Sequence, residues 1–151
     1  MNSEDLKITQ SKLIPATQDQ IWEFLIDETR MKNWFQAEKF AIDPYEGGEI
    51  KIRLTFGAEN YVIAGEIGLI LPKKKFVFTW LERDQYGETW FNNTSIIIEL
   101  EEVAAGTQCT FTHDGFKYLS NEIRSDVYAR YLEFWGAADI LERLQTLVMA
   151  A

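Results

Sequence analysis

The chain is poor in the residues used for metal and redox chemistry, with one cysteine and one histidine among its 151 residues. A lone cysteine cannot form an internal disulfide, so stability does not depend on an oxidising compartment. One histidine and one cysteine cannot supply the ligands of a typical zinc site. Cys109 lies within an alternating segment, which favours a small core residue over a nucleophile. The sequence therefore predicts no metal and no cofactor.

Sequence motifs of common enzymes are also missing. The chain has no phosphate-binding loop, no nucleophile elbow and no dinucleotide fingerprint, and Gly65 and Gly68 lack the following helix start that would make them meaningful for phosphate. The 24 acidic residues are scattered over predicted turns and polar faces. We therefore predict no catalytic residues, and a binding function is favoured over an enzymatic one.

Basic charge is scarce, with 15 Lys and Arg against 24 Asp and Glu and a net charge of −9. This charge repels phosphate backbones, so nucleic acid is not an expected partner. The one basic cluster, residues 73–75 directly after Pro72, either solvates a turn or forms an anion site.

Long apolar runs are absent as well. No segment approaches the length needed to span a bilayer, and residues 1–10 are polar without the apolar core of a signal peptide. We therefore expect a cytoplasmic protein without a membrane span. No internal repeat or linker rich in Pro, Gly or Ser divides the sequence, which predicts a single domain over residues 1–151.

Aromatic residues, in contrast, are plentiful. They make up 14% of the chain, with five Trp, six Tyr and ten Phe. This exceeds what a core of this size usually requires, so the surplus either over-fills the core or lines a pocket.

The C-terminal segment, residues 120–151, has the pattern of one long amphipathic helix. Apolar side chains recur there at steps of three or four: Val127, Tyr131, Phe134, Ala138, Leu141, Leu144 and Val148. The preceding seventy residues instead alternate as strands with one apolar face each. A long helix across a curved antiparallel sheet is the predicted architecture.

The segment before those strands predicts a first strand at residues 5–14 and two short helices. Thr17 with Gln20 has the form of a capping box, and Asp27 can cap the second helix. Clean alternation from Glu49 onward marks the next strand, and Gly65 and Gly68 allow a bulge or bend in the strand at 61–71. Further strands are predicted around 76–80, at 89–101 and at 107–114. The expected order is strand, two helices, six strands, helix.

The order of several short motifs resembles one known family. A first strand is followed by the helix start at 17–22, Met31-Lys32-Asn33-Trp34, Glu46-Gly47-Gly48 opening a strand, and Gly106-Thr107 leading to His113-Asp114-Gly115-Phe116. This series is similar to the AHSA1-like (activator of Hsp90 ATPase homologue) family of the START/Bet v 1-like superfamily, over about residues 6–147. The usual Gly-Trp pair early in the last helix is reordered here as Trp135-Gly136.

The resemblance implies an α+β helix-grip fold, in which a curved antiparallel sheet of about six to seven strands wraps around the C-terminal helix and leaves a hydrophobic cavity. Strand parity and helix phase point a set of residues into that space, with Trp34 near an entrance. Each either packs as plain core or lines the cavity. The candidate ligand-binding residues are Trp34, Ile52, Leu54, Phe78, Trp80, Trp90, Phe111, His113, Phe134 and Trp135.

His113 is the one side chain that titrates near neutral pH, and parity places it inward. It either donates a proton to a ligand carbonyl or phenol, or bonds a backbone carbonyl near Gly115.

Three functions remain open. The first is non-catalytic binding of a small hydrophobic or aromatic molecule, such as a lipid, sterol, polyketide or flavonoid-like compound. The second is a protein-interaction domain with a chaperone or other protein as its partner, in which outward-facing tryptophans would be the anchors. The third is a cyclase-like enzyme using His113. A monomer or a weak dimer is expected, since exposed tryptophans equally mark a dimer interface.

Overall fold

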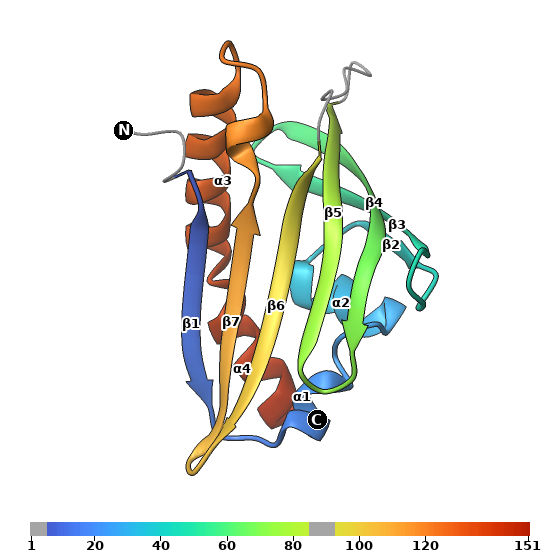
Figure 1. Cartoon of the computed structure of the whole chain (residues 1–151), viewed down its shortest axis with the longest axis vertical. Helices are drawn as coiled ribbons and strands as arrows, with labels where there is room; N and C mark the ends of the chain where they lie inside the picture. Colours follow the sequence, from blue (N-terminus) through green and yellow to red (C-terminus); the bar gives the residue numbers. More distant parts are fainter. Residues whose placement is uncertain (1–5, 85–92) are drawn as a thin grey trace.

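The computed structural model describes residues 6–84 and 93–151, which form a curved sheet with helices against one of its faces (Figure 1). In chain order the elements are β1 (Ile8–Ile14), α1 (Gln18–Trp22), α2 (Glu28–Phe35), β2 (Lys39–Ile42), β3 (Glu49–Phe56), β4 (Glu59–Leu71), β5 (Lys75–Asp84), β6 (Thr94–Val103), β7 (Gly106–Asp114), the 3-10 helix η2 (Phe116–Tyr118), α3 (Arg124–Ala138) and α4 (Ile140–Ala150). The predicted α+β helix-grip fold is confirmed.

The sheet contains seven antiparallel strands in the order β1-β7-β6-β5-β4-β3-β2. Neighbouring strands are consecutive in the chain, except for β1 and β7. The pairing of β1 with β7 places Ile8 opposite His113. Strand β2 completes the six strands expected after the helices, although its four residues give too short an alternation to be located from sequence. The predicted start of β6 at residue 89 lies outside the described residues.

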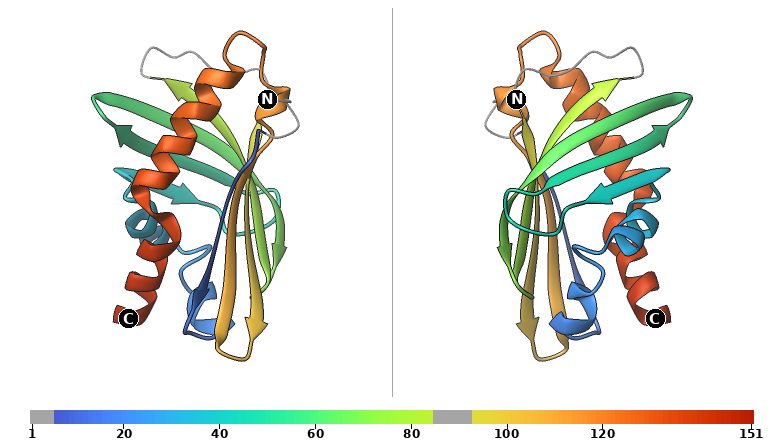
Figure 2. Two further views of the ribbon diagram at one scale, coloured as in Figure 1. Left: turned by 90° about the vertical axis from the view of Figure 1, so that its left-hand side faces the viewer. Right: turned by 90° about the vertical axis from the view of Figure 1, so that its right-hand side faces the viewer.

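Alternation and glycine positions explain the curvature of the sheet, which is visible in Figure 2. Along β3, exposed residues alternate with the buried Ile50, Ile52 and Leu54, as predicted. The pairing of β4 with β5 shifts register between Ile67 and Leu69, which confirms an irregularity at Gly68. A Cβ atom at Gly65 would lie 2.1 Å from the Thr79 carbonyl oxygen, so no larger residue fits there without a backbone shift.

Both short helices begin at the predicted caps. The Thr17 side chain accepts from the Gln20 backbone, and the Gln20 side chain accepts in return from the Thr17 N–H, which completes a capping box. Asp27 accepts from the Arg30 N–H at the start of α2. These caps fix where the two helices begin.

The C-terminal helix is bent rather than continuous, which corrects the expectation of a single helix. Asp139 has a left-handed backbone (φ 48°, ψ 57°) and separates α3 from α4. Aspartate tolerates this region better than most residues, so the chain can turn there without glycine. The Trp34 indole N–H donates to the Ile140 carbonyl at 2.7 Å, and the Arg143 guanidinium donates to the Trp34 carbonyl at 3.2 Å. The two bonds hold the junction against α2.

The helices α3 and α4 lie along the inner face of the sheet, and the β3–β4 end of the sheet curves past α3 (Figure 2). Buried residues of α3 are Val127, Tyr131 and Trp135, while α4 buries Ile140, Leu141, Leu144 and Val148. Phe134 and Ala138, which belong to the predicted apolar stripe, are only half-buried. Within the described residues, no helix has the length and apolar character needed to cross a membrane.

Candidate functional site

The candidate residues predicted from sequence come together between the sheet and α3, but most of them are packed core. Ile52, Leu54, Phe78, Trp80, Phe111, His113 and Trp135 are all buried. Trp34 is 0% exposed, so it lies inside the core and not at an entrance as expected. Phe134 is half-buried, and Trp90 lies outside the described residues.

Aromatic rings from the sheet, α2 and α3 pack against one another between the sheet and α3. The Trp135 ring centroid lies 4.9 Å from that of Phe111 and 5.5 Å from that of Trp80. Trp34 contacts Phe111 edge-on at 6.4 Å, and Tyr131 stacks near Trp135 at 6.1 Å. Edge-to-face contacts at these separations are those of a well-packed core. The surplus of aromatics therefore goes mainly into over-filling the core.

His113 is held by side chains that sequence reasoning did not connect to it. The Trp135 indole N–H donates to Nδ1 at 3.0 Å, and Nε2 lies 2.7 Å from Thr94 Oγ1, whose hydroxyl donates to the Trp80 carbonyl at 2.9 Å. These partners assign the ring proton to Nε2. Both ring nitrogens thus have side-chain partners, in place of the carbonyl near Gly115 that was one of the two alternatives for His113.

The environment of His113 keeps the imidazole neutral. Complete burial lowers its pKa to about 3, because the charged form would lose its hydration. Both nitrogens have partners and the side chain is 0% exposed. This arrangement suits a structural histidine better than a proton donor to a ligand. Burial likewise raises the pKa of the Cys109 thiol to about 12, as fits a core residue.

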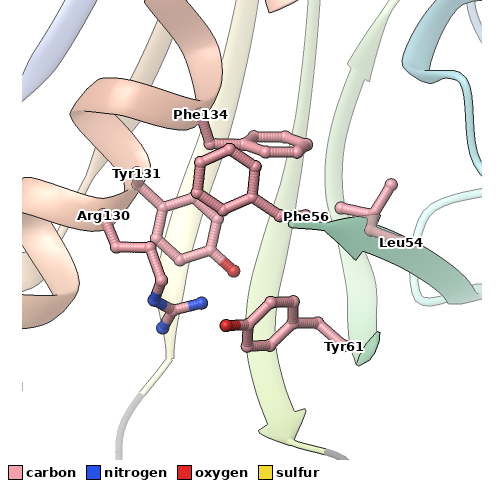
Figure 3. A pocket seen from close by; sticks show the side chains of 6 residues that line it. All are labelled: Leu54, Phe56, Tyr61, Arg130, Tyr131 and Phe134. Carbon is pink, nitrogen blue, oxygen red and sulfur yellow. The ribbon is translucent and has the colours of Figure 1, made fainter. Parts of the chain in front are cut away.

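A small void remains where the β3–β4 end of the sheet faces α3 (Figure 3). Its volume of about 10 Å³ has room for roughly one water molecule. The lining residues come from β3, β4 and α3: Leu54, Phe56, Tyr61, Arg130, Tyr131 and Phe134. Of the predicted cavity residues that the structure describes, Leu54 and Phe134 alone line this void.

An open groove of about 210 Å³ adjoins the void at the surface. It runs between the end of α2, the end of β3 and the junction of α3 with α4, and its walls include Gln36, Thr55, Ala137, Ala138 and Arg143. Leu54, Phe56 and Phe134 line both spaces. The half-buried Phe56 and Phe134 rings meet edge-on with centroids 5.3 Å apart. These two rings are therefore the main barrier between groove and void.

A buried ion pair lies behind the void, with Arg130 among the residues that line the void. Glu82 is 4% exposed, and its carboxylate accepts two hydrogen bonds from the Arg130 guanidinium, each at 2.7 Å. The Tyr131 hydroxyl donates to the same carboxylate at 2.5 Å and accepts from the Trp80 indole N–H at 2.9 Å. The Arg130 guanidinium also lies over the Tyr61 ring, 4.5 Å from its centroid.

The electrostatics of this cluster favour a neutral, closed network. Burial alone would lower the pKa of Arg130, but the hydrogen bonds and charge of Glu82 outweigh it and raise that pKa. Burial and the Glu82 charge raise the pKa of Tyr131 well above its usual value, so its hydroxyl stays protonated.

Sequence reasoning missed Glu82, although a signal was present. Glu82 continues the inward parity of Phe76, Phe78 and Trp80 along β5. A carboxylate at an inward position requires a partner, and that partner could not be identified from the strand alone.

Solved structures from several organisms share this fold. Protein Ms6760 from Mycobacterium smegmatis is similar with a TM-score of 0.75 at 17% identity, covering 99% of this chain and 94% of that chain. A protein from Arthrobacter aurescens gives a TM-score of 0.75 at 14% identity, covering 100% of this chain and 90% of the other. Protein MLL2253 from Mesorhizobium loti gives 0.74 at 17% identity, with 96% and 98% covered. At these identities the likeness shows the fold alone.

Comparison with curated protein sequences gave no match. The family model described as activator of Hsp90 ATPase homolog 1-like protein matches residues 15–147. The match extends from the end of β1 into α4 and supports a domain of the ligand-binding type in general, without naming a ligand. The chain belongs to this activator of Hsp90 ATPase homolog 1-like family, as its motifs predicted.

Proposed function

We propose that the protein binds a small hydrophobic or aromatic molecule, without catalysis, at the β3–β4 end of the space between sheet and α3. The observation that carries this proposal is that the void and the groove share Leu54, Phe56 and Phe134 as walls. Rotation of two half-buried rings would join the two spaces. The binding pocket is thus displaced from the tryptophan-rich centre that sequence reasoning favoured.

The open groove alone is smaller than a typical ligand pocket, so binding would require the two rings to move. Its volume of about 210 Å³ lies below the range of roughly 300–1,000 Å³ that is typical of ligand pockets. Moving the Phe56 and Phe134 rings aside would add their own space and that of the void. The bound ligand would then contact the same apolar walls that the two rings now cover.

The direct test is to fill the groove with a bulky residue and measure binding. Ala137 is exposed and lines the groove, so Ala137→Trp should block it at little cost in stability. Leu132→Trp places the same side chain at an exposed position on the same helix outside the groove and serves as the matched control. Thermal shift with naphthalene derivatives and with lipids provides the measurement, since a ligand at a hundredfold its Kd adds about 2.7 kcal/mol of stability.

We expect the wild type and Leu132→Trp to gain stability with a saturable aromatic ligand, and Ala137→Trp to lose that gain. Equal gains in all three would place the ligand elsewhere. The absence of any gain in the wild type would favour a protein partner instead. Among the described tryptophans, Trp34, Trp80 and Trp135 are buried and cannot be surface anchors, whereas Trp22 is half-buried.

A further inference from the structure

The hydrogen-bonding groups around the void restrict what kind of ligand it can accept. Arg130 has five N–H groups, of which one on each terminal nitrogen donates to Glu82. No residue in the described ranges 6–84 and 93–151 accepts the others, and the same holds for the Tyr61 hydroxyl. Both side chains line the void. The void itself is lined by apolar atoms, so a ligand that enlarged it toward Arg130 and Tyr61 would meet donors that no described residue uses.

The charge of Arg130 is balanced before any ligand arrives. The Glu82 carboxylate neutralises the Arg130 guanidinium through two parallel hydrogen bonds, and the Tyr131 hydroxyl donates a hydrogen bond to the same carboxylate. An anionic ligand would gain contact with Arg130 but would also lie near the buried Glu82 charge. It would lose its hydration without a net positive charge to compensate.

Figure 3 places the polar groups and the apolar rings at different ends of the void. The Arg130 guanidinium and the Tyr61 hydroxyl lie together, away from the Phe134 ring. A bound molecule that displaces Phe56 and Phe134 would thus have an aromatic body toward the groove and one end toward the donors.

We infer that the Glu82–Arg130 pair, with Tyr61, selects neutral aromatic molecules that carry an oxygen acceptor and discriminates against carboxylates. This inference rests on the proposed function, because it concerns the same pocket. An ether or carbonyl oxygen can accept from Arg130 or Tyr61 without disturbing the ion pair. Hydrogen bonds to charged donors are stronger than those between neutral groups.

Three probes of matched shape test the selectivity by calorimetric titration: 2-acetylnaphthalene, 2-ethylnaphthalene and 2-naphthoate. We expect the wild type to bind the ketone, 2-acetylnaphthalene, about tenfold more tightly than 2-ethylnaphthalene, because the ketone oxygen can accept one hydrogen bond from a charged donor. The ketone should also bind more tightly than the carboxylate. Equal binding of all three would overturn the inference while leaving the pocket intact. Binding of none would overturn both.

Glu82→Gln sharpens the test because it removes the negative charge and keeps the side-chain shape. The uncompensated Arg130 should then favour the anion, so the Kd for 2-naphthoate should fall about tenfold or more relative to that for the ketone. Glu99→Gln makes the same charge change at an exposed position on β6 and should leave the wild-type order unchanged. An unchanged order in a folded Glu82→Gln protein would overturn the inference.

Tyr61→Phe provides a second variant in case Glu82→Gln does not fold. It removes one donor and leaves the buried pair and the ring in place. The preference for the ketone over the ethyl compound should shrink by a few-fold. Tyr45→Phe, at a 60% exposed position, is the control and should retain the full preference. Retention of the full preference in Tyr61→Phe would remove Tyr61 from the proposed donors.

Discussion

The space between the sheet and α3 has two parts that differ in packing although both are rich in aromatics. Around His113, Trp80, Phe111 and Trp135, buried rings contact one another edge-on and both imidazole nitrogens have hydrogen-bond partners. At the β3–β4 end, Phe56 and Phe134 are half-buried beside a void and a groove. Regular apolar spacing is common to both parts, so spacing alone does not identify a binding site.

The largest expected difference between the two parts comes from adjacent residues on α3. Trp135→Ala should lower the free energy of unfolding by about 3–5 kcal/mol, because it removes a buried ring and leaves His113 Nδ1 without its donor. Phe134→Ala should cost only about 1–2 kcal/mol, because that ring is half-buried. Chemical denaturation of both variants measures the difference. Similar losses would contradict the distinction between packed and loose parts.

The ion pair that borders the void should show the next largest effect. Glu82→Leu leaves the Arg130 guanidinium without its partner and should cost about 2–4 kcal/mol, somewhat less than for a fully buried pair because the Arg130 side chain is 24% exposed. The double variant Glu82→Leu/Arg130→Met should recover most of that loss, since it removes both charges. A double variant as unstable as the single one would mean that the pair itself supplies the stability.

The packed part should also make stability depend on pH through His113. Its pKa is about 3 in the folded protein and about 6.5 in an unfolded chain, so the unfolded state binds more protons between these values. The neutral His113 therefore makes its full contribution to the free energy of unfolding above pH 6.5. That contribution falls by about 1.4 kcal/mol per pH unit as the pH drops from 6.5 toward 3. Urea unfolding of the wild type and His113→Gln at pH 7, 5 and 4 should show the two stabilities converging. Parallel curves would argue against a buried neutral imidazole.

The bend that separates the two halves of the C-terminal helix should have the smallest effect. Asp139 is held at φ 48°, where glycine is unstrained, so Asp139→Gly should raise stability by roughly 0.5–1 kcal/mol. Asp139→Val, which is β-branched, should lower it by about 1–2 kcal/mol. Thermal unfolding distinguishes the two variants. A stabilising valine would show that the left-handed turn is not required.

Local signals made much of the fold predictable. The capping box of Thr17 and Gln20, the alternation along β3 and the bulge near Gly68 each depend on residues close together in sequence. The chain order of motifs supplied the family. The bend at Asp139 was not predictable in this way, because the helical spacing of apolar residues continues across it.

The site was less predictable because it depends on contacts between distant elements. The parity of β5 was a signal for Glu82 that sequence reasoning did not use, and its partner Arg130 lies on a helix much later in the chain. Parity also placed His113 inward, yet its bonds to Thr94 and Trp135 require the assembled sheet and helix. Whether aromatics fill a cavity or line it depends on how their volumes sum across several strands and helices. The spacing of residues in the sequence does not reveal this combined volume.

The most direct test of the account is to map a bound aromatic ligand onto the protein by NMR. In a titration with 2-acetylnaphthalene, the backbone and side-chain resonances of Leu54, Phe56, Tyr61 and Phe134 should shift saturably and show contacts to the ligand. Resonances of His113 and Trp135 should change little. Ligand contacts centred on His113 and Trp135, with the β3–β4 end unaffected, would contradict the account.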